Sequence, residues 1–138
     1  MNEQMVYSTD DRLKPLADNV TLTAAWQTLG PPINTKGLLN VAMWVNGLKN
    51  DSDSIRIRCK CLPVVDSAEF YVAQIQTIGT NLVSLRSEEY ETSEPVFSFV
   101  TPLGFSAMVP YIQLEAKVNV VGVTPAVINK AILSFDRK

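Results

Sequence analysis

The sequence contains no histidine and only two cysteines among its 138 residues. Histidine is the usual general base near neutral pH and the commonest metal ligand, so its absence removes most schemes for activating a nucleophile. A zinc site takes about four ligands, mostly nitrogen and sulfur, and two cysteines do not supply them. We therefore expect no metal, no cofactor and no enzymatic activity.

An excess of charge and long apolar runs are missing as well. Twelve basic residues face 14 acidic residues, for a net charge of -2, whereas nucleic-acid-binding proteins carry a basic stripe. No apolar run approaches the roughly 20 residues that span a bilayer. The first residues, 1–8, lack the basic region and apolar core of a secretory signal. We expect neither nucleic acid nor a membrane as a partner, and synthesis in a cytoplasm.

The sequence does contain clear strand patterning, most legibly in residues 55–62. Apolar side chains occupy the odd positions of this segment, and the even positions carry the basic residues Arg56, Arg58 and Lys60. Successive side chains of a strand point to opposite faces, so this segment is predicted to have one buried and one solvated face. The same alternation returns in residues 112–120, which favours an antiparallel sheet packed on one side.

Both cysteines, Cys59 and Cys61, belong to the expected buried face. Residues two apart on a strand are separated by about 6–7 Å along it, which is too far for an unstrained disulfide. We predict two reduced thiols buried as small apolar side chains.

The whole chain divides into short strands separated by turn signals, without a helical pattern. The expected strands are residues 20–29, 38–48, 55–62, 69–77, 82–86, 96–100, 109–121 and 127–135. The predicted buried face of the second strand consists of Leu39, Val41, Met43 and Val45. About eight strands indicate an all-β, antiparallel β-sandwich of jelly-roll type, in preference to an immunoglobulin sandwich with its Cys–Trp–Cys spacing.

Two regions are predicted within the chain. Residues 1–17 are polar and irregular and are expected to form an amino-terminal arm, followed by a β-sandwich domain over residues 18–138. Polar termini are ordered only where something ties them down, so we expect the arm to contact a second chain.

The two tryptophans are expected to play different roles. Trp26 shares a two-residue period with Val20 and Leu22 and is predicted to lie in the core. Trp44 falls on the face opposite Val41 and Met43. It is expected to be exposed, or to pack beneath the arm or a partner subunit.

The carboxylates with the best spacing for acid–base chemistry are Asp51 with Asp53, and the cluster Glu88, Glu89 and Glu91. Both groups lie in polar stretches, where carboxylates are solvated and keep ordinary pKa values. Residues 51–53 also resemble part of a calcium-binding loop, but the glycine and the distal glutamate of such a loop are absent. We therefore predict a solvated hairpin tip over residues 50–54.

The basic residues at positions 56, 58 and 60 form either a solvated face or a partner for the acidic residues 88–94 of a neighbouring copy. No catalytic, cofactor-binding or metal-binding residue is expected. The candidate interface residues are Trp44, Tyr7, Arg56, Arg58, Lys60, Glu88, Glu89 and Glu91.

Three parts of the chain, taken in order, resemble one family. They are residues 22–30 (Leu-Thr-Ala-Ala-Trp-Gln-Thr-Leu-Gly), residues 40–45 followed by 54–58, and residues 109–116 (Val-Pro-Tyr-Ile-Gln-Leu-Glu-Ala) with 128–135. This order resembles the small jelly-roll structural proteins of tailed-phage virions. The resemblance implies a capsid decoration or head–tail accessory protein, partnered by other copies of itself and by a capsid or tail protein. It also implies a final location in the virion.

Carbohydrate-binding modules of the β-sandwich type show a similar order of strands. In that alternative, Trp44 and tyrosines in loops would serve as flat platforms for sugar rings. The sequence leaves this second function open.

Overall fold

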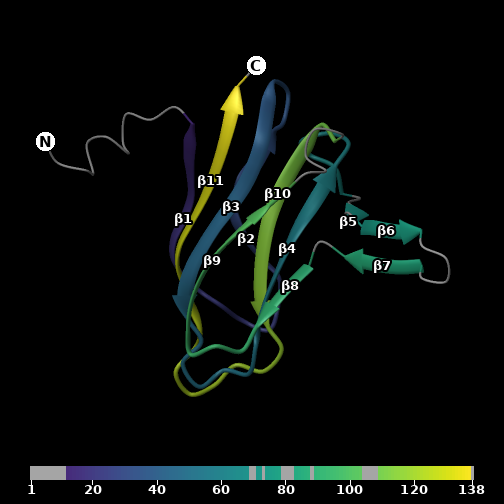
Figure 1. Cartoon of the computed structure of the whole chain (residues 1–138). Helices are drawn as coiled ribbons and strands as arrows, with labels where there is room; N and C mark the ends of the chain where they lie inside the picture. Colours follow the sequence, from purple (N-terminus) through teal and green to yellow (C-terminus); the bar gives the residue numbers. More distant parts are fainter. Residues whose placement is uncertain are drawn as a thin grey trace, which may run out of the picture.

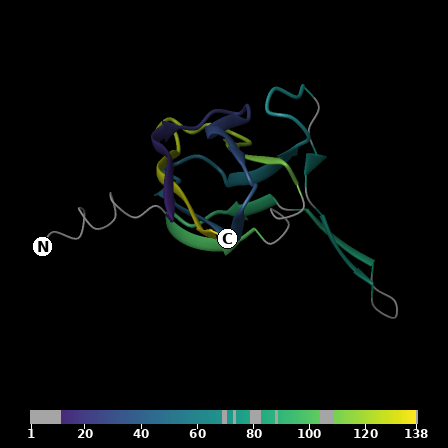
Figure 2. The ribbon, with the colours of Figure 1, turned by 90° about the horizontal axis from the view of Figure 1, so that it is seen from above.

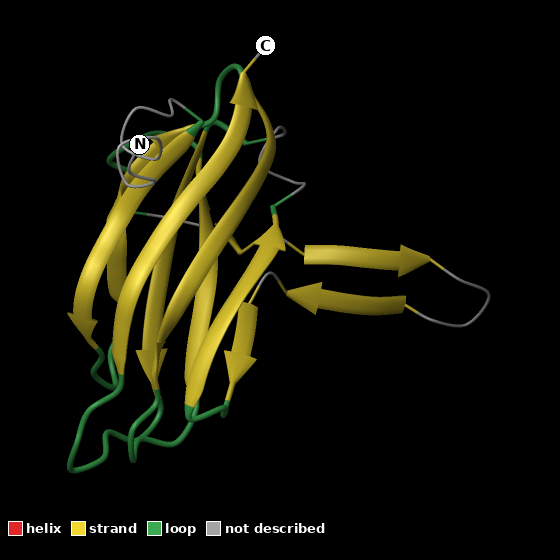
Figure 3. Cartoon of the chain, turned by 60° about the vertical axis from the view of Figure 1, so that its left-hand side comes forward, coloured by secondary structure: helices red, strands yellow, loops and turns green. Residues whose placement is uncertain are grey.

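The computed structural model of the chain describes residues 12–68, 71–72, 74–78, 83–87, 89–103 and 109–137. For the described residues from 71 to 89, it describes the backbone alone. Every regular element within these ranges is a β-strand (Figures 1 and 3). The strands are β1 (Leu13–Thr21), β2 (Gln27–Asn34), β3 (Leu38–Leu48), β4 (Ile55–Leu62), β5 (Tyr71–Val72), β6 (Gln74–Ile78), β7 (Val83–Ser87), β8 (Glu89–Thr92), β9 (Val96–Pro102), β10 (Tyr111–Val118) and β11 (Val127–Arg137).

Two antiparallel sheets face each other and form a sandwich, as the view from above shows (Figure 2). The first sheet has the order β1-β11-β3-β9, and the second has β2-β10-β4, with β5 and β8 both paired to the free edge of β4. Because β5 and β8 share one edge position, the sandwich has eight strand positions. Numbered along the chain, these positions lie side by side in the order 1-8-3-6 in the first sheet and 2-7-4-5 in the second. This is the strand order of a jelly roll, and the predicted fold class is confirmed.

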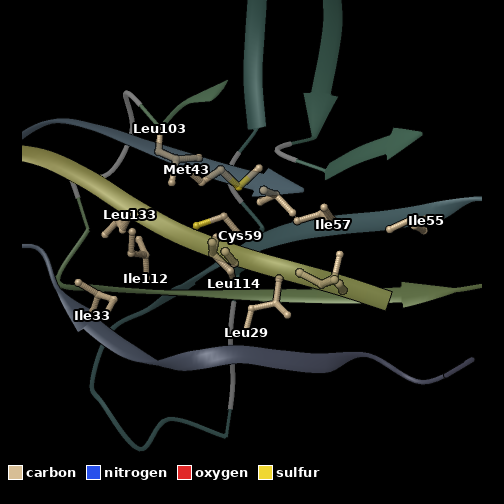
Figure 4. Close-up of a cluster of buried hydrophobic side chains, with 14 of the residues drawn as sticks. Leu29, Ile33, Met43, Ile55, Ile57, Cys59, Leu103, Ile112, Leu114 and Leu133 are labelled. Carbon is tan, nitrogen blue, oxygen red and sulfur yellow. The ribbon is translucent and has the colours of Figure 1, made fainter. Parts of the chain in front are cut away.

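The core lies between the two sheets (Figure 4). Ile55, Ile57 and Cys59 of β4 point into it, and Met43 and Leu133 come from the opposite sheet. Burying each such aliphatic side chain contributes about 1.5–3 kcal/mol. The predicted buried face of residues 55–62 is therefore confirmed, and both cysteines are free and buried as expected.

The first strand begins earlier than the sequence pattern indicates. Residues 13–17, expected to belong to the arm, already pair with β11 as part of β1. The pairing shifts register between Pro15 and Ala17, and Asn19 adopts a left-handed conformation with φ of 51°. These irregularities hide the two-residue period. Residues 1–11 lie outside the described residues.

Two further irregularities correct the expected strands. The expected strand over residues 20–29 is wrong at both ends, because residues 20–21 belong to β1 and β2 continues through residues 30–32, Gly-Pro-Pro, at the edge of its sheet. Its pairing with β10 skips these residues, and an edge strand tolerates proline where no ladder hydrogen bond is needed. In β3, Leu38 is buried and Leu39 is exposed, the reverse of the expected pattern. Asn40, with φ of 51°, forms a bulge that shifts the alternation.

A hairpin formed by β6 and β7 interrupts the edge strand of the second sheet. Val72 pairs with Lys60, and Glu89 pairs with Arg58, which lies two residues before Lys60 in β4. An uninterrupted edge strand would therefore have a single residue between Val72 and Glu89, where this chain has residues 73–88. The two strands of the hairpin pair with each other and project away from the sandwich (Figures 1 and 3).

Candidate functional site

The outer face of the first sheet carries an exposed tryptophan at its centre. Trp44 on β3 lies between Ile132 on β11 and Val100 on β9, directly opposite both in the strand register. About half of the Trp44 and Val100 surface is exposed, 49% in each case. The indole Nε1 of Trp44 donates a hydrogen bond of 2.7 Å to the hydroxyl of Ser134, which fixes the ring against the sheet. Trp44 therefore presents a flat apolar surface to solvent. Exposure was one of the two alternatives predicted for this residue.

The two residues directly opposite Trp44 in the strand register, Ile132 and Val100, are uncharged. We define the Trp44 face by these residues, which are adjacent in the register of β11, β3 and β9: Ala42, Trp44, Asn46, Ser98, Val100, Pro102, Ile132 and Ser134. Among the described residues, the nearest charges are Lys130, which stands opposite Asn46 and approaches Asp18 at 3.9 Å, and Asp136, which accepts a hydrogen bond from Asn40. The centre of a protein interface is typically depleted of charge and enriched in aromatic residues, which is the composition seen here.

The outer face of the second sheet is built from charges instead. Trp26 lies there and is half-buried, with the Arg58 guanidinium 4.1 Å from its ring centroid. Arg56 and Lys117 approach the same ring at 5.7 and 5.6 Å. The prediction that Trp26 lies in the core is wrong. The chain turns after Leu22, and β2 begins only at Gln27, so the alternation does not continue to Trp26.

A buried carboxylate organises the same face. Glu115 on β10 is only 6% exposed, and it lies opposite Arg58 in the register of β10 and β4. Its Oε1 accepts hydrogen bonds from Nε and Nη2 of Arg58 at 2.9 and 2.7 Å, and its Oε2 contacts Lys60 Nζ at 3.1 Å. Arg58 and Lys60 are therefore both bound to Glu115 within the chain. The guanidinium of Arg58 also covers the ring of Trp26.

The acidic segment adjoins the basic residues within one chain. Glu89 and Glu91 of β8 stand opposite Arg58 and Arg56 of β4 in the strand register. The carboxylate of Glu91 accepts a hydrogen bond of 2.7 Å from Ser54. The register therefore offers an intramolecular place for the acidic segment, without a neighbouring copy. Two other candidate residues, numbers 7 and 88, lie outside the described residues.

Asn50, Asp51 and Asp53 of the loop between β3 and β4 are exposed, as predicted for a solvated tip. The loop is not a hairpin, because β3 and β4 belong to different sheets, and its carboxylates support a neighbouring loop. The Oδ1 of Asp53 accepts hydrogen bonds from the backbone N–H groups of Asn119 and Val120 at 3.2 and 3.0 Å. The Oδ1 of Asp51 accepts one from Thr124 N–H at 2.7 Å. These long-range partners were invisible to local sequence patterns.

The hydrogen bonds to Asp53 also affect its acidity. The pKa of this carboxyl lies below its ordinary value, chiefly because the Val120 N–H stabilises the ionised form. The N–H groups of Ser54 and Asn119 act in the same direction, whereas desolvation of the carboxylate opposes them. A lowered pKa keeps Asp53 charged, which suits a structural acceptor and not a general acid.

Within the described ranges, no group of three or more His, Cys, Asp or Glu residues could hold a metal ion. The same part of the chain has no helix of the length and hydropathy needed to cross a membrane. A scan against protein-family models and a search of the curated proteins each find no match to this chain.

The structure brings together only some of the residues that the sequence marked. Arg56, Arg58 and Lys60 share the charged face, whereas Trp44 lies on the opposite side of the sandwich. Glu115 was missed as a site residue. Glu115 belongs to a strand with a two-residue alternation. Pairing that strand with residues 55–62 would have placed its carboxylate beside Arg58 and Lys60.

Proposed function

We propose that this chain is a non-enzymatic structural protein of a tailed-phage particle, of the capsid decoration or head–tail accessory type. In this proposal it binds the particle surface, self-associates and resides in the virion after synthesis in the host cytoplasm. Two findings support the proposal. The resemblance to small virion proteins implies a jelly roll, and the strand order is that of a jelly roll. The second finding is a surface with the composition of a protein contact.

The Trp44 face is the observation that carries the proposal. A half-exposed tryptophan among uncharged neighbours is costly to leave in water, and tryptophan is the residue most enriched at the energetic centre of interfaces. We assign this face to contact with a second copy of the chain. In a two-fold contact each patch meets itself, so any charge near the axis would face a like charge. The centre of the Trp44 face would avoid that repulsion, because Trp44 and the residues directly opposite it, Ile132 and Val100, are uncharged.

The test is a substitution that removes the ring and leaves the core intact. Trp44→Ser should weaken self-association at least tenfold, about 1.4 kcal/mol, measured by sedimentation equilibrium. Val64→Ser is the control, because Val64 is also exposed but lies in the loop after β4. An unchanged association constant for Trp44→Ser would show that copies do not meet through this face.

The amino-terminal segment offers a second test of assembly. Because β1 already begins at Leu13, a clean truncation removes residues 2–11 and leaves the strand intact. The truncated protein should keep its fold and lose at least tenfold in self-association or particle binding, about 1.4 kcal/mol. Undiminished binding by both measurements would remove the arm from the proposal.

The alternative function, carbohydrate binding, would use the same tryptophan. Its other expected platforms are placed elsewhere, since Tyr90 packs against Phe99 with ring centroids 6.4 Å apart and Tyr111 belongs to the second sheet. A glycan array probed with the wild type and with Trp44→Ser distinguishes the two functions. Glycan binding that disappears in the variant would favour the carbohydrate-binding module.

A further inference from the structure

The loop between β10 and β11 presents three valines to solvent at one end of the sandwich. Val120, Val121 and Val123 are 65%, 41% and 95% exposed. We call these three residues the valine tip. Single exposed apolar residues are ordinary on protein surfaces, but a contiguous group is characteristic of a binding site.

The backbone of the valine tip is fixed by the loop between β3 and β4. In addition to the contacts of Asp51 and Asp53, the hydroxyl of Ser52 accepts hydrogen bonds from the N–H groups of Gly122 and Ala126 at 3.3 and 3.1 Å. Ser52 is only 3% exposed. The side-chain amide of Asn50 donates to the carbonyl of Pro125 at 2.8 Å. Acceptors from one loop thus hold the backbone before, within and after the valine tip.

Gly122 allows the two loops to approach closely. A Cβ atom at this position would lie 2.4 Å from the backbone oxygen of Asp51. The glycine therefore permits the hydrogen-bonded support, and the flanking valines are turned outward from it. A pre-organised loop loses little conformational entropy on binding, so more of the free energy gained by burying its apolar surface contributes to affinity.

The charges beside the valine tip indicate what it contacts. Asp51 and Asp53 are exposed at the same end of the sandwich. Glu94 is exposed as well, beside Pro95, whose carbonyl accepts a hydrogen bond from the Lys49 N–H. The ammonium group of Lys49 donates a hydrogen bond of 2.9 Å to the carbonyl of Ser52. Segments that enter a lipid interface usually combine large apolar residues with Lys and Arg, a pattern opposite to this one. The exposed charged groups in direct contact with the loop of the valine tip are the carboxylates of Asp51 and Asp53. Small apolar side chains beside carboxylates suit an apolar pocket bordered by basic residues.

We propose that the valine tip is the element that docks this chain on its particle, inserted into an apolar, basic-rimmed pocket of a capsid or tail protein. The inference rests on the proposed function and adds which end of the jelly roll faces the particle. The Trp44 face, on the outer side of the first sheet, then remains accessible for contact between copies.

The experiment uses the full chain and particles of the source phage prepared without it. The triple variant V120S/V121S/V123S should bind these particles at least tenfold more weakly than the wild type in a co-sedimentation assay. Because all three side chains are exposed, the triple variant should fold normally, with the circular dichroism spectrum and the urea midpoint of the wild type. The matched control V64S/V65S replaces exposed valines in the loop after β4, and its particle binding should equal that of the wild type.

The other outcomes overturn the proposal in distinguishable ways. If the triple variant bound the particles as tightly as the wild type, the valine tip would not be the docking element, and the proposed function would be unaffected. If the wild type did not bind the particles, both proposals would be rejected. Wild-type binding to phosphatidylcholine or phosphatidylserine vesicles, lost in the triple variant, would assign the tip to lipid. A lower association constant of the triple variant in sedimentation equilibrium would place the tip between copies.

Discussion

The two outer faces of the sandwich each carry one tryptophan, in opposite surroundings. Trp26 on the second sheet lies beneath Arg58 and beside Arg56 and Lys117, within a face whose buried acid, Glu115, is held by cations. Trp44 on the first sheet lies among uncharged residues and is half exposed. The charged face is satisfied by its own chain, whereas the Trp44 face leaves apolar surface in water.

This difference separates the contributions of the two faces to stability and to association. Hydrogen-bonded charges removed from water stabilise the fold only as a complete set, because removing one member strands the others. An exposed apolar ring contributes little to the isolated chain but much to a complex that buries it. Substitutions on the second sheet should therefore change the unfolding free energy, and substitutions on the first sheet should change association.

The largest effect is expected for Glu115→Ala, which removes the carboxylate shared by Arg58 and Lys60. The unfolding free energy should fall by about 3 kcal/mol, measured by urea denaturation. Asp18→Ala is the matched control, because Asp18 approaches Lys130 only at 3.9 Å in an exposed pair. That substitution should cost less than about 1 kcal/mol. Equal losses in both variants would remove the distinction between a buried and an exposed charge pair.

A pair of tryptophan substitutions should give opposite readouts. Trp26→Ser should lower the unfolding free energy by about 1–2 kcal/mol through loss of ring packing and of the Arg58 stacking, and leave self-association unchanged. Trp44→Ser should change association more than stability. Urea denaturation and sedimentation equilibrium on both variants test this, and parallel changes in both assays would contradict the assignment of the two faces.

A smaller effect on folding is expected when the hairpin is removed. Deleting residues 74–88 leaves one residue between Val72 and Glu89, the number that an uninterrupted partner of β4 requires. The variant should fold with an unfolding free energy within about 1 kcal/mol of the wild type, because an isolated two-stranded hairpin adds little stability in water. Circular dichroism and urea denaturation provide the measurement. A molten or aggregated product would show that the charged face depends on the hairpin.

The smallest effect concerns a carboxylate outside both faces. The folded-state pKa of Asp53 lies below its ordinary value of 3.8, so its contribution to stability is present above that value and is lost as the pH falls through the folded-state pKa. The melting temperature of the wild type should therefore exceed that of Asp53→Asn at pH 7, and the difference should shrink between about pH 5 and pH 2. A difference independent of pH would contradict the assigned cause.

Regular strands could be predicted from the sequence, and irregular ones could not. Residues 55–62 keep a strict two-residue period, so their buried face and both thiols follow from local pattern alone. The errors occur where a bulge resets the alternation, at Asn40 in β3 and near Pro15 in β1. A bulge depends on the partner strand, which a single segment does not reveal.

The candidate site followed the same division. The exposure of Trp44 was foreseeable because it alternates with Met43 and Val45, which are buried, and so lies on the opposite face of β3. Trp26 was misplaced because it lies in the turn between β1 and β2, where the two-residue period is broken. The support of the valine tip by residues 50–53 joins segments far apart in the chain. Those contacts arise from tertiary topology, which brings the β3–β4 and β10–β11 loops to one end of the sandwich.

The interrupted edge strand has a practical consequence for engineering. Because β4 holds both halves of its partner in place, the position between Val72 and Glu89 is a ready graft point whose two ends are anchored in the same sheet. An epitope or an affinity tag could replace residues 74–88 there and be displayed away from the rest of the molecule. If the chain coats a particle, every copy would then display that cargo from the side of its sandwich in an ordered array.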